Sequence, residues 1–383
     1  MKQFYPLSTF LTEYSEKNVG NTYRPVAVGR YGIRTRESIY SKELAKDYSK
    51  NKLIHKNTLT VGMGSVQIDI GVLTDDITYS VSPAYHTYNI AGVNAEYLRY
   101  CLECRNQDMF SRFVKRGSRQ GKTIDLKRWL TYEIPVYDEN RQQEIVDRLN
   151  RISELIEKRQ EQLIQLSELV KSRFIELFGT VKDNPYHFPT ATLKEVCHKI
   201  TDGKHGGCEQ ETNSGYYYVG AREIYDGVIH YDTAPQITFA DFAKDYRRCN
   251  IEQGDMVIVN TGATIGKSAI ASSPLTERTL LQKSVALIKV KTDVISAKFL
   301  RYCYMANPSM YMVESASAQP NLLLSKMNAT VIYLPPMELQ EQFAAFVEQT
   351  DKSKYYSSLS YRYCQAAANT YRQEWMTCRT SDF

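Results

Sequence analysis

Apolar residues recur at alternating spacings of four and three between residues 140 and 178. This seam consists of Ile145, Leu149, Ile152, Ile156, Leu163, Leu166 and Val170, with Arg159 as its one break. The spacing is typical of a coiled-coil helix, and Gly179 suits the position just after a helix end. At 1.5 Å per residue the helix would be about 60 Å long. It needs a second helix, because so long an apolar stripe would otherwise stay in water.

The pattern predicts the second helix over residues 337 to 378. Phe343 and Val347 continue a seam, but Thr350 and Lys354 stand where Ile152 and Ile156 stand in the first helix. We expect an antiparallel pair that is tight near Phe343 and looser or partner-bound further on; the alternative is that the tail frays. Tyrosines replace leucines here, and the face from Tyr355 to Trp375 is a candidate docking surface. These tyrosines are Tyr355, Tyr356, Tyr361, Tyr363 and Tyr371.

The chain contains an internal repeat. Tyr97-Leu98-Arg99-Tyr100-Cys101 recurs as Phe299-Leu300-Arg301-Tyr302-Cys303, and Val61-Gly62-Met63-Gly64 resembles Val259-Asn260-Thr261-Gly262. A period of about 200 residues is too long for a solenoid, so it indicates that one domain-plus-helix unit was duplicated. Segments such as 255–260 and 284–290 are short, β-branched and bounded by turns, which predicts strands. Two copies of one binding unit suggest a target with two separated parts.

The composition of the chain limits the classes of protein to which it can belong. The chain has 383 residues, 43% hydrophobic content and a net charge of +5, which favours a globular, mildly basic protein of two to three domains. Neither a signal peptide nor an apolar run long enough to span a bilayer is evident, so we expect a cytoplasmic protein. Cys101 and Cys104 form a C-x-x-C without a second pair. Packing is therefore a better interpretation of these cysteines than redox chemistry or metal binding.

Catalytic motifs are incomplete. Asn184-Pro185-Tyr186 lacks the second proline of an amino-methyltransferase loop, and it follows a helix, so we interpret it as a turn. The segment from Gly262 to Ser268 ends in Gly-Lys-Ser, but it has three residues between its glycines where a P-loop has four. The histidines near residues 187–230 show no metal-ligand spacing on a helix. The sequence therefore favours a binding protein over an enzyme.

Several segments together resemble the specificity subunits of type I restriction-modification systems. They are Thr201-Asp202-Gly203-Lys204-His205-Gly206, Thr261-Gly262-Ala263-Thr264-Ile265-Gly266-Lys267, Ala316-Ser317-Ala318-Gln319-Pro320-Asn321-Leu322 and Leu334-Pro335-Pro336, together with Leu177-Phe178-Gly179 before Asn184-Pro185. The resemblance covers essentially the whole chain in the family's order. The first half departs from it, because Gln120-Gly121-Lys122 lacks the Gln-Pro-Asn form.

The resemblance implies an α+β fold with pseudo-twofold symmetry, in which two target-recognition domains (1–138 and 180–335) are joined by two long antiparallel coiled-coil helices (139–179 and 336–383). It implies a non-catalytic, phage-defence subunit that binds a bipartite double-stranded DNA target. Two methyltransferase subunits and restriction subunits would be its partners, and S-adenosylmethionine, ATP and Mg²⁺ would belong to them. The alternatives are a stand-alone two-domain DNA-binding protein and, from another class, a catalytic methyltransferase.

Side chains suited to phosphates and base edges are the candidate DNA contacts, because Arg and Lys suit guanine whereas Asn and Gln suit adenine. In the first half they are Arg112, Lys115, Arg116, Arg119, Gln120 and Lys122. In the second half they are Lys204, His205, Arg222, Asn260, Thr261, Lys267, Gln319 and Asn321. If rigid helices hold the two halves apart, helix length would set a fixed gap between the two parts of the target.

Overall fold

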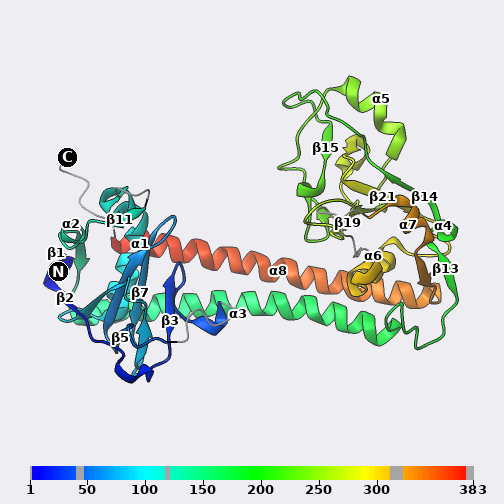
Figure 1. Cartoon of the computed structure of the whole chain (residues 1–383). Helices are drawn as coiled ribbons and strands as arrows, with labels where there is room; N and C mark the ends of the chain where they lie inside the picture. The colour runs from blue at the N-terminus through cyan, green and yellow to red at the C-terminus, as the bar shows by residue number, and fades with distance from the viewer. Residues whose placement is uncertain (1, 40–46, 117–120, 311–321, 377–383) are drawn as a thin grey trace. The chain divides into compact units, whose positions relative to one another are not determined.

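The computed structural model describes residues 2–39, 47–116, 121–310 and 322–376 (Figure 1). The chain divides into two compact units. Unit 1 comprises Met1–Arg159 and Leu359–Phe383, and unit 2 comprises Gln160–Ser358. Each unit therefore contains a mixed domain and one half of each of two long helices, α3 (Glu139–Phe178) and α8 (Met337–Met376).

Unit 1 is built on a four-stranded antiparallel sheet in the order β2-β9-β6-β7, with helix α1 against β7. Its core includes Leu59, Tyr88, Leu98 and Trp129. The helices and strands are β1 (Gln3–Pro6), β2 (Leu11–Tyr14), β3 (Val26–Gly29), β4 (Gly32–Thr35), β5 (Lys52–Ile54), β6 (Thr58–Met63), β7 (Ile68–Leu73), β8 (Tyr79–Val81), β9 (His86–Ile90), α1 (Ala95–Phe113), β10 (Val114–Arg116), β11 (Lys122–Ile124), α2 (Leu126–Trp129) and β12 (Glu133–Val136).

Unit 2 has the corresponding sheet, in the order β14-β21-β18-β19, and again all neighbours are antiparallel. The elements of unit 2 are β13 (Thr190–Thr192), α4 (Leu193–Val196), β14 (Cys197–Asp202), β15 (Tyr217–Val219), β16 (Ile224–Tyr225), β17 (Val228–Ile229), α5 (Phe239–Cys249), β18 (Met256–Val259), β19 (Ser268–Ile270), β20 (Thr279–Leu281), β21 (Val285–Val290), α6 (Ala297–Ala306), α7 (Leu324–Ala329) and β22 (Val331–Tyr333). The strands expected over 255–260 and 284–290 are confirmed as β18 and β21.

The sequence repeat corresponds to a repeat of topology. The Tyr97–Cys101 motif lies in α1 and its copy lies in α6, while Val61 and Val259 lie in the equivalent strands β6 and β18. Outside the sheet, β1 pairs with β12 in unit 1 as β13 pairs with β22 in unit 2. The units differ in their insertions, because within the described residues only unit 2 has the helix α5 and the parallel pair β15–β20.

Within each unit, the first part of one long helix packs against the last part of the other, as an antiparallel pair requires. In unit 1, Ile145 and Leu149 of α3 share a core with Tyr371 and Trp375 of α8. In unit 2, the Phe174 ring of α3 lies 5.3 Å from the Phe343 ring of α8, edge to face. Aromatic packing of this kind adds to the burial of apolar area.

The predicted seam is buried most deeply near the ends of α3. Ile145, Leu149, Val170, Phe343 and Val347 are buried. The four remaining seam residues are only half-buried, and these are Ile152, Ile156, Leu163 and Leu166.

The alternative of a frayed second helix is wrong as far as Met376, where the described part of the helix ends. Helix α8 is continuous from Met337, and Tyr371 and Trp375 are buried in the core of unit 1. The proposed docking face therefore does not extend to Trp375. Tyr355, Tyr356 and Tyr363 remain exposed. Residues 377 and 378 lie outside the described residues.

The motifs interpreted as non-catalytic are turns or packed helix. Residues 262–267 form the turn between β18 and β19, a strand-turn-strand rather than the strand-to-helix turn of a P-loop. Asn184 lies in the turn between α3 and β13 with φ of 34°. Burial raises the pKa of the Cys104 thiol to about 11. Among the described residues, no group of side chains has the arrangement of a metal site. No helix in these same stretches is apolar over the length that a membrane crossing requires.

Candidate nucleic-acid interface

In unit 1 the basic hairpin β10–β11 lies against the turn between β6 and β7. The Lys122 ammonium donates a hydrogen bond to the Ser65 carbonyl oxygen at 2.7 Å, and it lies 5.2 Å from the centroid of the Phe110 ring. Residues 64–67 form this turn, and Ser65 and Val66 are exposed. Segments more than fifty residues apart in the sequence thus form one surface.

Two other predicted DNA contacts of the first half lie in this hairpin or directly before it, Lys115 in β10 and Arg112 near the end of α1. Arg112 donates to Asp108 at 2.7 Å, and Lys115 donates to Asp125 at 2.7 Å. The hydrogen bond from Lys115 is the main reason why the pKa of Asp125 is lowered. Both cations remain more than half exposed, at 54% and 59%. Exposed ion pairs are weak, so each cation is available to a phosphate.

Three more predicted contacts of the first half belong to the same stretch of chain. Arg116 is the last residue of β10, and its backbone pairs with Lys122. Arg119 and Gln120 lie outside the described residues.

In unit 2 the corresponding turn has a similar neighbour. The Leu322 N–H donates to the Asn260 carbonyl oxygen at 2.7 Å, so the segment after α6 reaches the β18–β19 turn. Asn260 itself is buried, and its N–H donates to the Ser284 carbonyl oxygen at 3.0 Å. Thr261 is half-buried and Lys267 is exposed. Lys267 is therefore the exposed cation of this turn, whereas Asn260 is buried and its backbone is hydrogen-bonded on both sides. Gln319 and Asn321 lie outside the described residues.

The Thr201–Gly206 segment contacts both the helix α5 and the strand β20. The Lys204 ammonium lies 2.7 Å from Asp245 and 3.9 Å from Asp241, both on α5, and its side chain is 13% exposed. Gly203 packs so closely against β20 that an added Cβ would lie 2.2 Å from the Leu281 carbonyl oxygen. These contacts give Lys204 an intramolecular role, which the sequence interpretation had missed.

Asp202 of the same segment binds His205 and, through Arg248, the helix α5. His205 Nε2 lies 2.9 Å from the Asp202 carboxylate, and Arg248 of α5 donates to the same carboxylate and to the Gly203 carbonyl oxygen at 2.9 Å. Burial raises the pKa of Asp202, but the hydrogen bonds from His205 and Arg248 outweigh it, so the pKa lies below its usual value. The His205 side chain is still half exposed. Arg222, in the short helix Ala221–Glu223, is exposed too.

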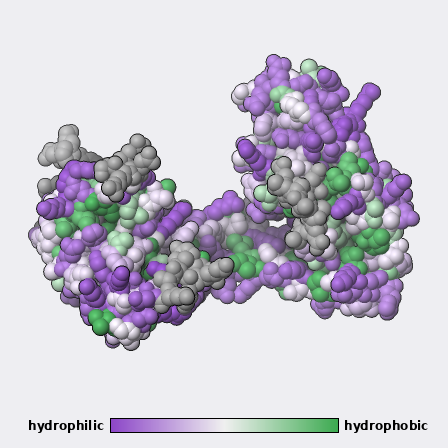
Figure 2. All heavy atoms as spheres, in the orientation of Figure 1, coloured by the Kyte–Doolittle hydropathy of each residue, from purple (hydrophilic) through white to green (hydrophobic). Residues whose placement is uncertain are grey.

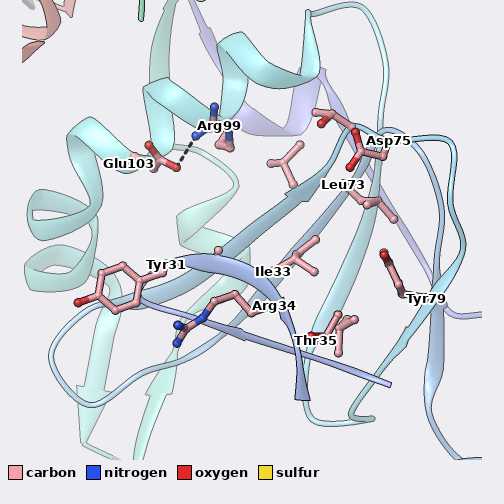
Figure 3. A pocket seen from close by; sticks show the side chains of 13 residues that line it. Tyr31, Ile33, Arg34, Thr35, Leu73, Asp75, Tyr79, Arg99 and Glu103 are labelled. Atoms are coloured by element: carbon pink, nitrogen blue, oxygen red, sulfur yellow. Dashed lines mark hydrogen bonds and ion pairs between the residues drawn. The ribbon is translucent and has the colours of Figure 1, made fainter. Parts of the chain in front are cut away.

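The hairpin β3–β4 carries exposed cations that sequence reasoning had passed over. Arg30 and Arg34 lie 5.7 and 5.1 Å from the centroid of the Tyr31 ring. Beside them is an open depression of about 260 Å³, whose lining also includes Asp75 of the segment after β7 and the ion pair between Arg99 and Glu103 (Figure 3). Its charges are of both signs. It is therefore a poorer phosphate surface than the β10–β11 hairpin, and we assign no ligand to it.

The turn 64–67 is the other feature that sequence reasoning left out. A signal was present, because Gly64 aligns with Gly262 in the repeat and the residues around Gly262 were already candidates.

Figure 2 shows that hydrophilic residues predominate on the visible face of each unit, with apolar residues in scattered patches. An interface with DNA is more polar and more basic than one between proteins, so such a surface is compatible with DNA binding.

Comparison with known proteins identifies the family. The family model described as "Type I restriction modification DNA specificity domain" matches the chain twice, over residues 9–166 and 186–355. No curated protein sequence is significantly similar to the chain.

Two solved structures share the fold. The S subunit of a type I restriction-modification system from M. genitalium aligns with a TM-score of 0.59 at 15% identity, over 99% of this chain and 97% of that one. A structure concerned with complex assembly and conformational transition of the type I R-M system aligns with a TM-score of 0.56 at 15% identity, over 98% and 97% of the two chains. At this identity the likeness supports the fold, while the two matches of the family model carry the assignment. The chain belongs to the family of type I restriction-modification DNA specificity domains, and it serves as a specificity subunit that recognises DNA sequence and leaves catalysis to other subunits.

Proposed function

We propose that the chain recognises a bipartite double-stranded DNA target, with one part read by each unit. The observation that carries this proposal is the duplicated topology. Both units have an antiparallel four-stranded sheet in the same order, and both place a later chain segment against the turn that follows the equivalent strands β6 and β18. Two binding surfaces built alike but with different side chains would read two different short sequences.

Phosphate contacts in this proposal come from exposed cations of the two units. They position the protein on the duplex, whereas side chains at base edges supply specificity. The exposed cations are Arg112, Lys115 and Lys122 in unit 1 and Arg222 and Lys267 in unit 2, with Arg116, Arg119, Gln120, His205, Thr261, Gln319 and Asn321 as further candidates. Lys204 is excluded from this set because two aspartates hold its ammonium.

The long helices are proposed to determine the spacer between the two parts of the target. Both units contain half of α3 and half of α8, so the length of these helices enters the geometry of binding. Four residues inserted after Leu163, with a matching insertion in α8, would lengthen each helix by about 6 Å, or roughly two base pairs. The spacer of the methylated target should grow accordingly. An unchanged spacer would refute this part of the proposal.

The partners are proposed to be two methyltransferase subunits and the restriction subunits of the system, in the cytoplasm. S-adenosylmethionine, ATP and Mg²⁺ would be bound by those subunits. Support comes from large apolar side chains exposed on the long helices, such as Ile164 and Leu169 on α3 and Tyr356 on α8. Exposed apolar surface of this kind is typical of protein interfaces.

The test is to co-express the chain with the methyltransferase subunit of its system and to map methylated bases in DNA. We expect co-purification and methylation at a two-part sequence with a fixed gap, which disappears without the chain. A stand-alone DNA-binding protein would bind DNA without the methyltransferase subunit and would not change methylation. Binding of S-adenosylmethionine by the isolated chain would contradict the non-catalytic role.

A further inference from the structure

We propose that the β6–β7 turn of unit 1, residues 64–67, is a base-reading element. Val66 would contact the methyl group of a thymine, and the side-chain amide of Gln67 would bind an adenine. This inference rests on the proposed function and deepens it, because it assigns individual side chains to one part of the target. Four observations in unit 1 support it, and the turn in unit 2 gives a fifth.

The turn is short and tightly closed. Met63 and Ile68 pair across the β6–β7 ladder, which leaves four residues to reverse the chain. A Cβ at Gly64 would lie 2.6 Å from the Gln67 carbonyl oxygen, so the close approach of these backbones requires glycine. A turn restricted in this way holds its outer side chains in defined positions.

A side chain of helix α1 holds the residue that follows the turn. The Asn106 side chain, which is buried, accepts a hydrogen bond from the Ile68 N–H at 2.9 Å and donates one to the Ile68 carbonyl oxygen at 2.9 Å. Both backbone groups of the residue directly after the turn are therefore bound to a helix. A reading element must be held close to its productive geometry by such supporting contacts.

A positive charge lies at the turn. Lys122 donates to the Ser65 carbonyl oxygen, and the basic hairpin that carries Lys122 also carries Lys115. DNA-binding proteins combine phosphate contacts for register with nearby side chains at base edges. The hairpin supplies the first kind of contact, and the turn is positioned to supply the second.

The exposed chemistry of the turn suits A·T base pairs. Val66 is 62% exposed at the outside of an otherwise polar turn, although Ile68, two residues later, is buried. The Gln67 side chain has no hydrogen-bond partner within the described part of the chain. In the major groove only thymine presents a methyl group, and glutamine binds the N6 and N7 atoms of adenine in bidentate fashion.

In unit 2 the corresponding turn is also contacted by a later segment of the chain. The β18–β19 turn is contacted by the segment that follows α6, through the hydrogen bond from Leu322 to Asn260. Its exposed residues are Ala263 and Lys267, whereas the turn of unit 1 exposes Ser65 and Val66 and keeps Gln67 half-buried. The corresponding turns of the two units therefore carry different chemistry, as two readers of different sequences would.

The experiment compares base preferences of the full chain in complex with its methyltransferase subunit, selected from DNA in which every position of the target is randomised in turn. The variants are Val66→Ser and Gln67→Ala. Their matched controls are Val19→Ser and Gln107→Ala, which change exposed residues of unit 1 outside the turn. We expect Gln67→Ala to lower discrimination for one adenine by about 5- to 150-fold, and Val66→Ser to lower it for one thymine by about fivefold. The controls should leave all preferences unchanged.

Base preferences that are unchanged in both variants, or binding that weakens equally for all sequences, would overturn the inference. The other part of the target serves as an internal control for folding, because it should keep its full preference in every variant. If the wild-type complex selects no two-part target, the proposed function itself fails. If it selects one and the variants behave like the wild type, only the role of the turn fails.

Discussion

Gln142 and Gln340 make the same pair of hydrogen bonds in the two units. Each donates to the carbonyl oxygen of the residue five positions earlier, at 2.7 and 2.9 Å. Each also accepts from the N–H of the residue before a repeated helix, Asn94 before α1 and Ser296 before α6, at 2.9 Å. Both glutamines are buried. The start of each long helix is thereby joined to the helix that carries the repeated Leu-Arg-Tyr-Cys motif.

Replacing either glutamine should destabilise its unit. Gln340→Ala leaves the Ser296 N–H and a buried carbonyl oxygen without their partner, and such a loss costs about 1–3 kcal/mol. Gln142→Ala should have a similar effect on unit 1. Urea denaturation of the full chain measures both, with the exposed Gln342→Ala as the control, which should change the free energy of unfolding by less than about 0.5 kcal/mol. Equal stability of Gln340→Ala and the control would show that this hydrogen-bonded link contributes nothing.

Removing a lysine that is proposed to contact phosphate should weaken binding to all DNA sequences alike. For Lys122→Ala and for Lys267→Ala we expect the slope of log affinity against log salt concentration to fall by about one. Titrations at several salt concentrations measure this slope, with Lys352→Ala on α8 as the control. Lys204→Met should instead leave the slope unchanged and lower stability, because Asp241 and Asp245 lose their cation. A reduced slope in Lys204→Met would assign that lysine to DNA after all.

Two glycines close together in the sequence should respond very differently to replacement by alanine. Gly203→Ala places a Cβ 2.2 Å from the Leu281 carbonyl oxygen, so the backbone of β20 or of the Thr201–Gly206 segment must move. We expect a loss of about 3 kcal/mol or more. Gly207→Ala meets no atom within 4 Å and should be nearly neutral. Thermal denaturation compares the two variants, and similar melting temperatures would contradict the close approach.

The Asp202 carboxylate should make the stability of unit 2 sensitive to acid. Since its pKa is lowered in the folded chain, its contribution is complete above the pKa of the unfolded chain, about 3.9, and is lost as the pH falls through the lower folded value. Asp202→Asn should therefore be less stable than the wild type at neutral pH, and the difference should shrink on acidification. Urea midpoints between about pH 7 and pH 3 test this. A difference that stays constant with pH would rule out Asp202 as the source.

Local patterns in the sequence predicted the elements that depend on local spacing. The apolar spacing along α3 and the glycine after it give the position of that helix, because helical periodicity is a property of neighbouring residues. The repeat of Leu-Arg-Tyr-Cys likewise predicted two similar units. The glycine spacing from Gly262 to Gly266 does not suit a P-loop, and these residues lie in the turn between the paired strands β18 and β19.

The sequence could not show which polar or aromatic side chains meet partners far away along the chain. Trp375 packs against Tyr97 of a much earlier helix, with the two rings 5.3 Å apart. The ammonium of Lys204 lies against two aspartates of α5 and is mostly buried. The ammonium of Lys122 donates a hydrogen bond to the turn 64–67. The sequence by itself determined the two long helices, the strands β18 and β21 and the duplication, since these follow from short-range periodicity and from self-similarity. Only the tertiary structure decided which cations are buried in ion pairs and which stay exposed, because an ion pair or a buried ring depends on packing between distant segments.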